Sequence, residues 1–183
     1  MLELSRGSTG LLVVDFQDKL AAAMPDAVRA AAEHNVETLL LAAEMLGVPV
    51  VATEQYPKGL GRTTAILSPI FDRMGVRPFE KLVFSAARVP EVAARMSTVQ
   101  TWVVVGMETH VCVYQTAREL VRQGHGVHVV EDACASRTED NRRIGLELCR
   151  AAGAVGTSTE VVVFDLLGEA GSDAFRALSK RIK

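Results

Sequence analysis

A chain of 183 residues, with 49% hydrophobic and 23% charged residues, is long enough to bury the core of one compact domain, so we predict a single domain over residues 1–183. The formal net charge is −2 and no run of Lys and Arg exceeds two residues, which argues against nucleic acid or a charged membrane surface as a partner. No apolar run approaches the roughly 18 to 20 residues of a membrane-spanning helix, so we expect a cytoplasmic protein with a small-molecule partner.

The first third of the chain predicts two buried strands with a helix between them. Residues 10–15 and 48–52 are continuous aliphatic and β-branched runs, which are typical of strands buried on both faces of a parallel sheet. Between Pro25 and Gly47, apolar residues recur every three or four positions, which predicts an amphipathic helix ending at a glycine. Residues 55–62 are rich in Gly and Pro and predict a loop, where binding residues often lie.

The remaining chain repeats this alternation. We expect strands at residues 81–85, 101–106, 126–132 and 154–158. We expect helices at residues 90–96, 113–122, 140–152 and 161–164, although the β-branched residues of the last segment also suit a strand. Strands that alternate with helices predict an α/β fold with right-handed crossovers and a parallel sheet covered on both faces.

Three residues with reactive side chains lie at predicted strand ends. Asp15 closes the first strand, Lys81 lies at the third, and Cys112 lies one turn beyond the fourth. Ligands of open α/β sheets bind outside the carboxyl ends of the strands, so these side chains can converge there. By residue type alone Asp15 could equally cap a helix, and Lys81 could be an ordinary solvated lysine.

Cys112 is the strongest candidate nucleophile of the three cysteines. It lies near a predicted helix start with Thr109 as a plausible N-cap, where free N–H groups and the helix dipole favour a thiolate. The alternative is a small buried apolar residue, which we expect for Cys134 and Cys149, although Cys134 could border the site. The three cysteines contain no Cys-x-x-Cys pair, so we predict free thiols without a disulfide or zinc cluster.

The four histidines are weaker candidates. His110 is two residues from Cys112, but adjacent turn positions rarely let an imidazole reach back to the sulfur. His34, His125 and His128 have no spacing typical of metal ligands, and we expect structural roles for them.

Three segments resemble the signature blocks of the isochorismatase-like cysteine hydrolases, in the same order. They are residues 11–17 (LLVVDFQ), 80–85 (EKLVFS) and 105–117 (VGMETHVCVYQTA). Residues 53–61 and 131–137 are most similar to the isochorismatase domain-containing subgroup. The resemblance implies a Rossmann-like three-layer α/β/α fold with a six-stranded parallel sheet. It also implies a homo-oligomer, a dimer or larger, and the predicted helices beside the fourth and fifth strands carry Ala-rich and Leu-rich faces that suit one.

The resemblance also implies a catalytic triad of Asp15, Lys81 and Cys112. A cis peptide between Met107 and Glu108 is implied, with the backbone N–H groups of Glu108 and Cys112 as an oxyanion hole. We therefore expect an acyl transfer in which Asp15 accepts the thiol proton, the sulfur attacks a small amide, and water hydrolyses the thioester. Six residues are expected to line the substrate pocket: Phe16, Gln17, Glu54, Tyr56, Phe84 and His110.

This chain differs from two kinds of enzyme in the family, and each difference argues against one activity. Nicotinamidases of this family hold a metal with Asp-x-His and a further histidine after the second strand. This chain has Glu54-Gln55-Tyr56 there and no histidine between His34 and His110, so we predict no metal and no other cofactor. Isochorismatases proper lack a cysteine at the position of Cys112, which argues against cleavage of a vinyl ether.

Two other classes of function compete with a hydrolase. A dinucleotide-dependent oxidoreductase would carry G-x-G-x-x-G after the first strand, but residues 15–20 read DFQDKL, which excludes it. A non-catalytic or regulatory member that binds a metabolite in the same pocket stays open as an alternative.

Overall fold

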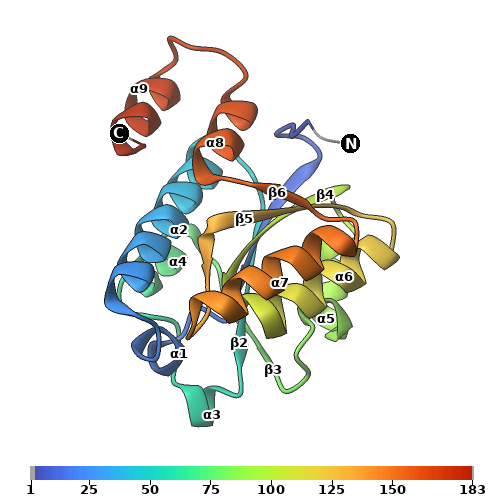
Figure 1. Ribbon diagram of the computed structural model, residues 1–183. Coiled ribbons are helices and arrows are strands. Elements are labelled where there is room, and N and C mark those ends of the chain that lie inside the picture. The colour runs from blue at the N-terminus through green and yellow to red at the C-terminus, as the bar shows by residue number, and fades with distance from the viewer. Residues whose placement is uncertain (1–2, 183) are drawn as a thin grey trace.

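The computed structural model describes residues 3–182 and contains a central sheet of six parallel strands in the order β3-β2-β1-β4-β5-β6. The strands are β1 (Thr9–Val14), β2 (Val50–Gln55), β3 (Phe79–Lys81), β4 (Thr101–Met107), β5 (Gly126–Ala135) and β6 (Val155–Thr157). The chain builds outward from β1 to β3, then returns to β4 and builds outward on the other side (Figure 1). The carboxyl ends of β1 and β4 therefore meet where the strand order reverses, the usual place for a ligand in such sheets.

Helices cover both faces of this sheet (Figure 1). They are α1 (Asp18–Ala22), α2 (Asp26–Leu46), α3 (Pro57–Leu60), α4 (Ser68–Met74), η1 (Ala86–Arg88), α5 (Pro90–Met96), η2 (Thr109–Val113), α6 (Tyr114–Arg122), α7 (Glu139–Ala151), α8 (Thr159–Leu167) and α9 (Asp173–Arg181). None of the helices among residues 3–182 has the length and apolar content to cross a membrane. The predicted α/β fold with a six-stranded parallel sheet is confirmed.

The core consists of two apolar layers, one on each face of the sheet. In β1, Leu11 and Val13 pack with α2, α4 and α8, whereas Leu12 and Val14 pack with α5, α6 and α7. Successive side chains of a strand point to opposite faces, so a strand buried on both faces must be apolar at every position. This explains why β1 and β4 have continuous aliphatic sequences.

The structure corrects several predicted boundaries. The strand expected at 81–85 is wrong, because β3 ends at Lys81 and the apolar residues that follow are exposed, with Leu82 74% accessible. Strand β5 extends to Ala135 past an irregularity in its pairing with β4, so Cys134 lies inside the strand rather than beyond it. The helix expected at 161–164 is confirmed within α8, whose N-cap Ser158 accepts a hydrogen bond from the Val161 N–H.

Candidate active site

Asp15 lies at the carboxyl end of β1, buried at the point where the strand order reverses. Its backbone adopts a left-handed conformation, with a φ of 50°. The Thr53 hydroxyl donates to one carboxylate oxygen at 2.8 Å, and the Lys81 ammonium donates to the other at 2.6 Å. Burial raises the pKa of the Asp15 carboxyl above its usual value, and the positive charge of Lys81 partly opposes this increase. Asp15 is thus a better proton acceptor than an exposed carboxylate.

The Lys81 ammonium is buried and has three hydrogen-bond acceptors. Besides Asp15, it donates to the Gln55 side-chain oxygen at 2.7 Å and to the Phe84 carbonyl at 3.0 Å. An ammonium has three N–H donors, so these contacts use all of them. Lys81 can therefore hold Asp15 in place and supply positive charge, but it has no donor left for a substrate.

Cys112 lies on η2, a single π-helical turn before α6, with 5% of its surface accessible. The thiol interacts with both Asp15 and Lys81, so the structure brings the three predicted residues together. Burial and then the negative charge of Asp15 raise the pKa of the Cys112 thiol to about 12. The structure therefore opposes the thiolate that the helix start would favour, because desolvation outweighs the favourable charge of Lys81.

The structure also corrects the expected N-cap at this turn. The residue at the N-cap position is Glu108, and the buried Thr109 hydroxyl has no hydrogen-bond partner among residues 3–182. The Glu108 carboxylate instead accepts hydrogen bonds from the backbone N–H and the side chain of Arg137. The peptide bond between Met107 and Glu108, for which the resemblance implies a cis geometry, is cis.

Gly106 allows β1 and β4 to approach closely beside the site. Its φ is 129°, and a Cβ atom there would lie 2.0 Å from the Val14 carbonyl oxygen. Such a distance is far inside van der Waals contact, so only glycine fits at this position.

Three of the expected substrate-binding residues are committed to the fold instead. Phe16 is fully buried in the core layer with α2. Gln17 uses its side-chain amide on backbone groups, donating to the carbonyls of Gln55 and Gly61 and accepting from the Gln55 N–H. Glu54 accepts hydrogen bonds from the Thr63 N–H and hydroxyl. A role in substrate binding stays a prediction for these three residues. The structure gives their side chains partners within the protein, which the sequence could not show because a position after a strand does not reveal where a side chain points.

The other three expected substrate-binding residues are accessible. Tyr56 and Phe84 are each 51% exposed, and Tyr56 lines a cavity of about 280 Å³ together with Lys81 and Leu82. His110 is partly buried, and its Nδ1 lies 3.1 Å from the Ser136 hydroxyl. That contact directs the imidazole toward the carboxyl end of β5, so no Cys-His pair is required to explain the position of His110.

Sequence reasoning missed two residues that organise the site, Thr53 and Gln55. They orient Asp15 and Lys81 from the carboxyl end of β2. A signal was present, because both are polar residues at the carboxyl end of a parallel strand, where ligands of such sheets bind. Among residues 3–182, no group of three or more His, Cys, Asp and Glu side chains is placed to hold a metal ion.

Comparison with known proteins places this chain in a family. A family model described as the isochorismatase domain matches residues 9–161. The chain is 42% identical over 155 residues to the secreted isochorismatase effector Isc1 of Phytophthora sojae, a match that covers 82% of this chain and 73% of that protein. It is 35% identical over 182 residues to isochorismatase domain-containing protein 2A of Mus musculus, covering 96% and 83% of the two chains.

Alignment with a solved structure shows that the fold is also that of this family. The YcaC gene product of Escherichia coli, described as an octameric hydrolase of unknown specificity, aligns with a TM-score of 0.89 at 21% identity, covering 99% of this chain and 91% of that chain. The chain therefore belongs to the isochorismatase domain family, and its six-stranded parallel sheet is the fold of that family's hydrolases.

Proposed function

We propose that this protein is a cysteine hydrolase that cleaves a small amide or related acyl compound through Cys112, Asp15 and Lys81. The observation that carries the proposal is one buried carboxylate that pairs with a buried ammonium and interacts with a buried thiol. A buried ion pair costs desolvation energy and is a weak source of stability, so its position beside a thiol favours a chemical role.

The first step is transfer of the Cys112 proton to Asp15. Burial raises the pKa of both groups, and the raised basicity of Asp15 makes it a better acceptor for a thiol proton. The thiolate then forms beside the Lys81 ammonium, which lowers its energy. Because the resting thiol keeps its proton, we expect the nucleophile to form only when a substrate carbonyl is in place.

Acyl transfer follows from the same three groups. The Cys112 sulfur forms a bond to the carbonyl carbon, the C–N bond breaks, and Asp15 returns the proton to the departing amine. A water molecule that loses a proton to Asp15 then attacks the thioester, releasing the acid and restoring the thiol. We assign the developing oxyanion to the backbone N–H groups of Glu108 and Cys112, where fixed dipoles would stabilise it without reorganisation.

We propose that the reaction needs neither a metal nor another cofactor, and that the enzyme is a homo-oligomer of two or more copies. The octameric state described for YcaC supports an oligomer, as do the exposed apolar residues that follow Lys81. A cytoplasmic location stays a prediction, because the Phytophthora sojae relative is described as secreted.

The test is a search for both turnover and the covalent intermediate. The protein would be incubated with a panel of small primary amides and esters, with release of ammonia or acid measured and the intact mass recorded after acid quenching. We expect turnover and an acyl adduct on Cys112, and we expect Cys112→Ala and Asp15→Asn to reduce turnover by about a thousandfold or more. A compound that is turned over equally by Cys112→Ala would refute the proposal. A ligand that binds near the triad but is never cleaved would favour the non-catalytic, metabolite-binding alternative.

A further inference from the structure

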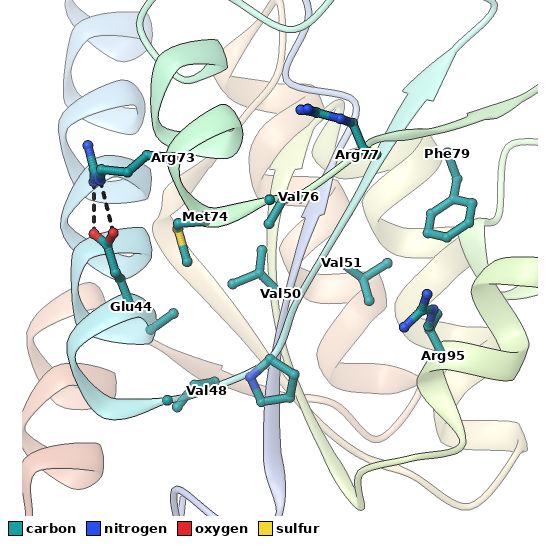
Figure 2. Close-up of a pocket in the computed structure, with 14 residues that line it drawn as sticks. Glu44, Val48, Val50, Val51, Arg73, Met74, Val76, Arg77, Phe79 and Arg95 are labelled. Carbon is teal, nitrogen blue, oxygen red and sulfur yellow. Dashed lines mark hydrogen bonds and ion pairs between the residues drawn. The ribbon is translucent and has the colours of Figure 1, made fainter.

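A cavity lies at the opposite end of β2 from the triad. It has a volume of about 660 Å³, within the range typical of small-molecule sites, and lies between the end of α2, the start of β2, the end of α4 and α5 (Figure 2). Strand β2 rises about 3.3 Å per residue, so Val50 in this cavity and Gln55 beside Lys81 are about 17 Å apart. The cavity is therefore separate from the proposed active site.

An incomplete strand pairing leaves space for this cavity. Strand β3 pairs only with Thr53, Glu54 and Gln55, so within residues 3–182 the first half of β2 has β1 as its only strand neighbour. Val50, at the start of the strand, is consequently only partly buried. Met74 and Val76 join it on one face of the sheet and Val51 faces the other, so these four residues form an apolar floor around the uncovered edge of β2 (Figure 2).

Three arginines and one glutamate are the charged residues that line the cavity, so the lining is positive on a chain whose net charge is −2. Arg73 forms a two-bond ion pair with Glu44, and Arg77 pairs with Asp72 at the surface. Arg95 has no hydrogen-bond or ion-pair partner for its guanidinium among the described residues. Figure 2 shows it on the other side of the apolar floor from Arg73, beside Phe79.

We propose that this cavity binds a small anion with an apolar body, with Arg95 as the principal contact to its carboxylate or phosphate group. A planar guanidinium presents paired N–H donors that match carboxylate and phosphate oxygens, and the valine and methionine floor receives the apolar part. Arg77 can add a second contact, because its pair with Asp72 joins two exposed groups and is easily exchanged. This inference does not depend on the proposed hydrolase activity.

The test uses phenylphosphonate as the anionic probe and benzyl alcohol as a neutral compound with a similar ring. Methyl NMR signals of Val50, Val51 and Val76 in the intact protein would be followed during titration. We expect saturable shifts of these signals with phenylphosphonate, and much smaller shifts with benzyl alcohol. Arg95→Gln should weaken phenylphosphonate binding about tenfold, because a hydrogen bond to a charged group is lost.

A matched control is Arg122→Gln, which removes an exposed arginine from the last turn of α6, outside the cavity. It should leave the affinity within about twofold, because the charge removed lies far from the probe and is screened by salt. Three results would each overturn the inference: no saturable shift at concentrations up to about 10 mM, where even a weak site fills; equal affinities of Arg95→Gln and the parent protein; or shifts confined to Val111 beside Cys112.

Discussion

Replacement of Lys81 by methionine removes the only cation that contacts the buried Asp15 carboxylate among residues 3–182. The methionine side chain has a similar length, so the change removes charge and hydrogen bonds more than volume. Asp15 keeps the hydrogen bond from the Thr53 hydroxyl but loses its counter-charge. Removal of one partner of a buried ion pair typically costs about 3–5 kcal/mol, because an uncompensated charge remains in the interior. For a chain of this length that corresponds to a decrease in Tm of about 6–20 °C.

The loss of stability in Lys81→Met should depend on pH in a definite direction. Burial already raises the pKa of Asp15 above its ordinary value of 3.8, and Lys81 is the largest factor that lowers it. In Lys81→Met the pKa of Asp15 should therefore rise further. A group whose pKa is raised by folding contributes stability at low pH that is lost as the pH rises through its folded pKa. The difference in unfolding free energy between the variant and the parent protein should thus be small near pH 4 and widen toward pH 7.

Urea denaturation between pH 4 and 8 measures this difference directly. The double variant Asp15→Asn with Lys81→Met leaves no unpaired charge, so we expect it to be more stable at pH 7 than Lys81→Met alone by at least about 1 kcal/mol. Lys58→Met removes an exposed lysine and should change stability by no more than about 0.5 kcal/mol. A Lys81→Met variant as stable as the parent at pH 7, or one whose deficit does not depend on pH, would refute this account of the pair.

Three further outcomes are expected. Alkylation of Cys112 by iodoacetamide should accelerate continuously from pH 7 to 10 without a plateau near 8.5, because the pKa of the thiol is raised to about 12. Asp15→Asn should speed alkylation at pH 8, because it removes a negative charge that raises this pKa. Slower alkylation of Asp15→Asn than of the parent protein would contradict this electrostatic effect. Gly106→Ala should lower the unfolding free energy, measured by urea titration, by about 3 kcal/mol or more, because the added Cβ meets a backbone oxygen at a position with a positive φ. The control Gly7→Ala places its Cβ in open space and should change the unfolding free energy by less than about 0.5 kcal/mol. Leu82→Ser should leave stability nearly unchanged because the side chain is 74% exposed, but it should lower the molar mass measured by light scattering if this loop joins copies of the chain.

The prediction of the fold depended on local patterns, which found the long strands and the helices α2 and α5 to α8 but missed the helices α1, α4 and α9, and also α3 in the segment 55–62 expected to be a loop. Continuous apolar runs in β1 and β4 follow from burial on both faces, and each such run was assigned as a strand. Lys81–Ser85 misled the same reasoning, because three apolar residues in a row resemble a buried strand although they face solvent here. Apolar periodicity cannot show whether a neighbouring element exists to cover a segment.

Part of the candidate site could be predicted from local sequence patterns, and part could not. The order of strands and helices in the sequence, with Asp15 and Cys112 at two strand ends, was enough to bring these residues to one edge of a parallel sheet. The role of Lys81 needed the resemblance to a family, because a lysine at a strand end is usually solvated. Thr53 and Gln55 come just after the apolar run that predicted the strand, yet their partners lie 38 and 26 residues away.

The amino-acid sequence by itself determined the α/β class, the parallel sheet and the identity of the reactive side chains, because these follow from residue type and periodicity along a few consecutive positions. Only the tertiary structure decided the protonation of Cys112, the three partners of Lys81 and the commitment of Phe16 and Gln17 to the fold. These properties depend on burial and on contacts between segments far apart in the chain. Desolvation is set by everything that packs around a group, and no local pattern contains that information.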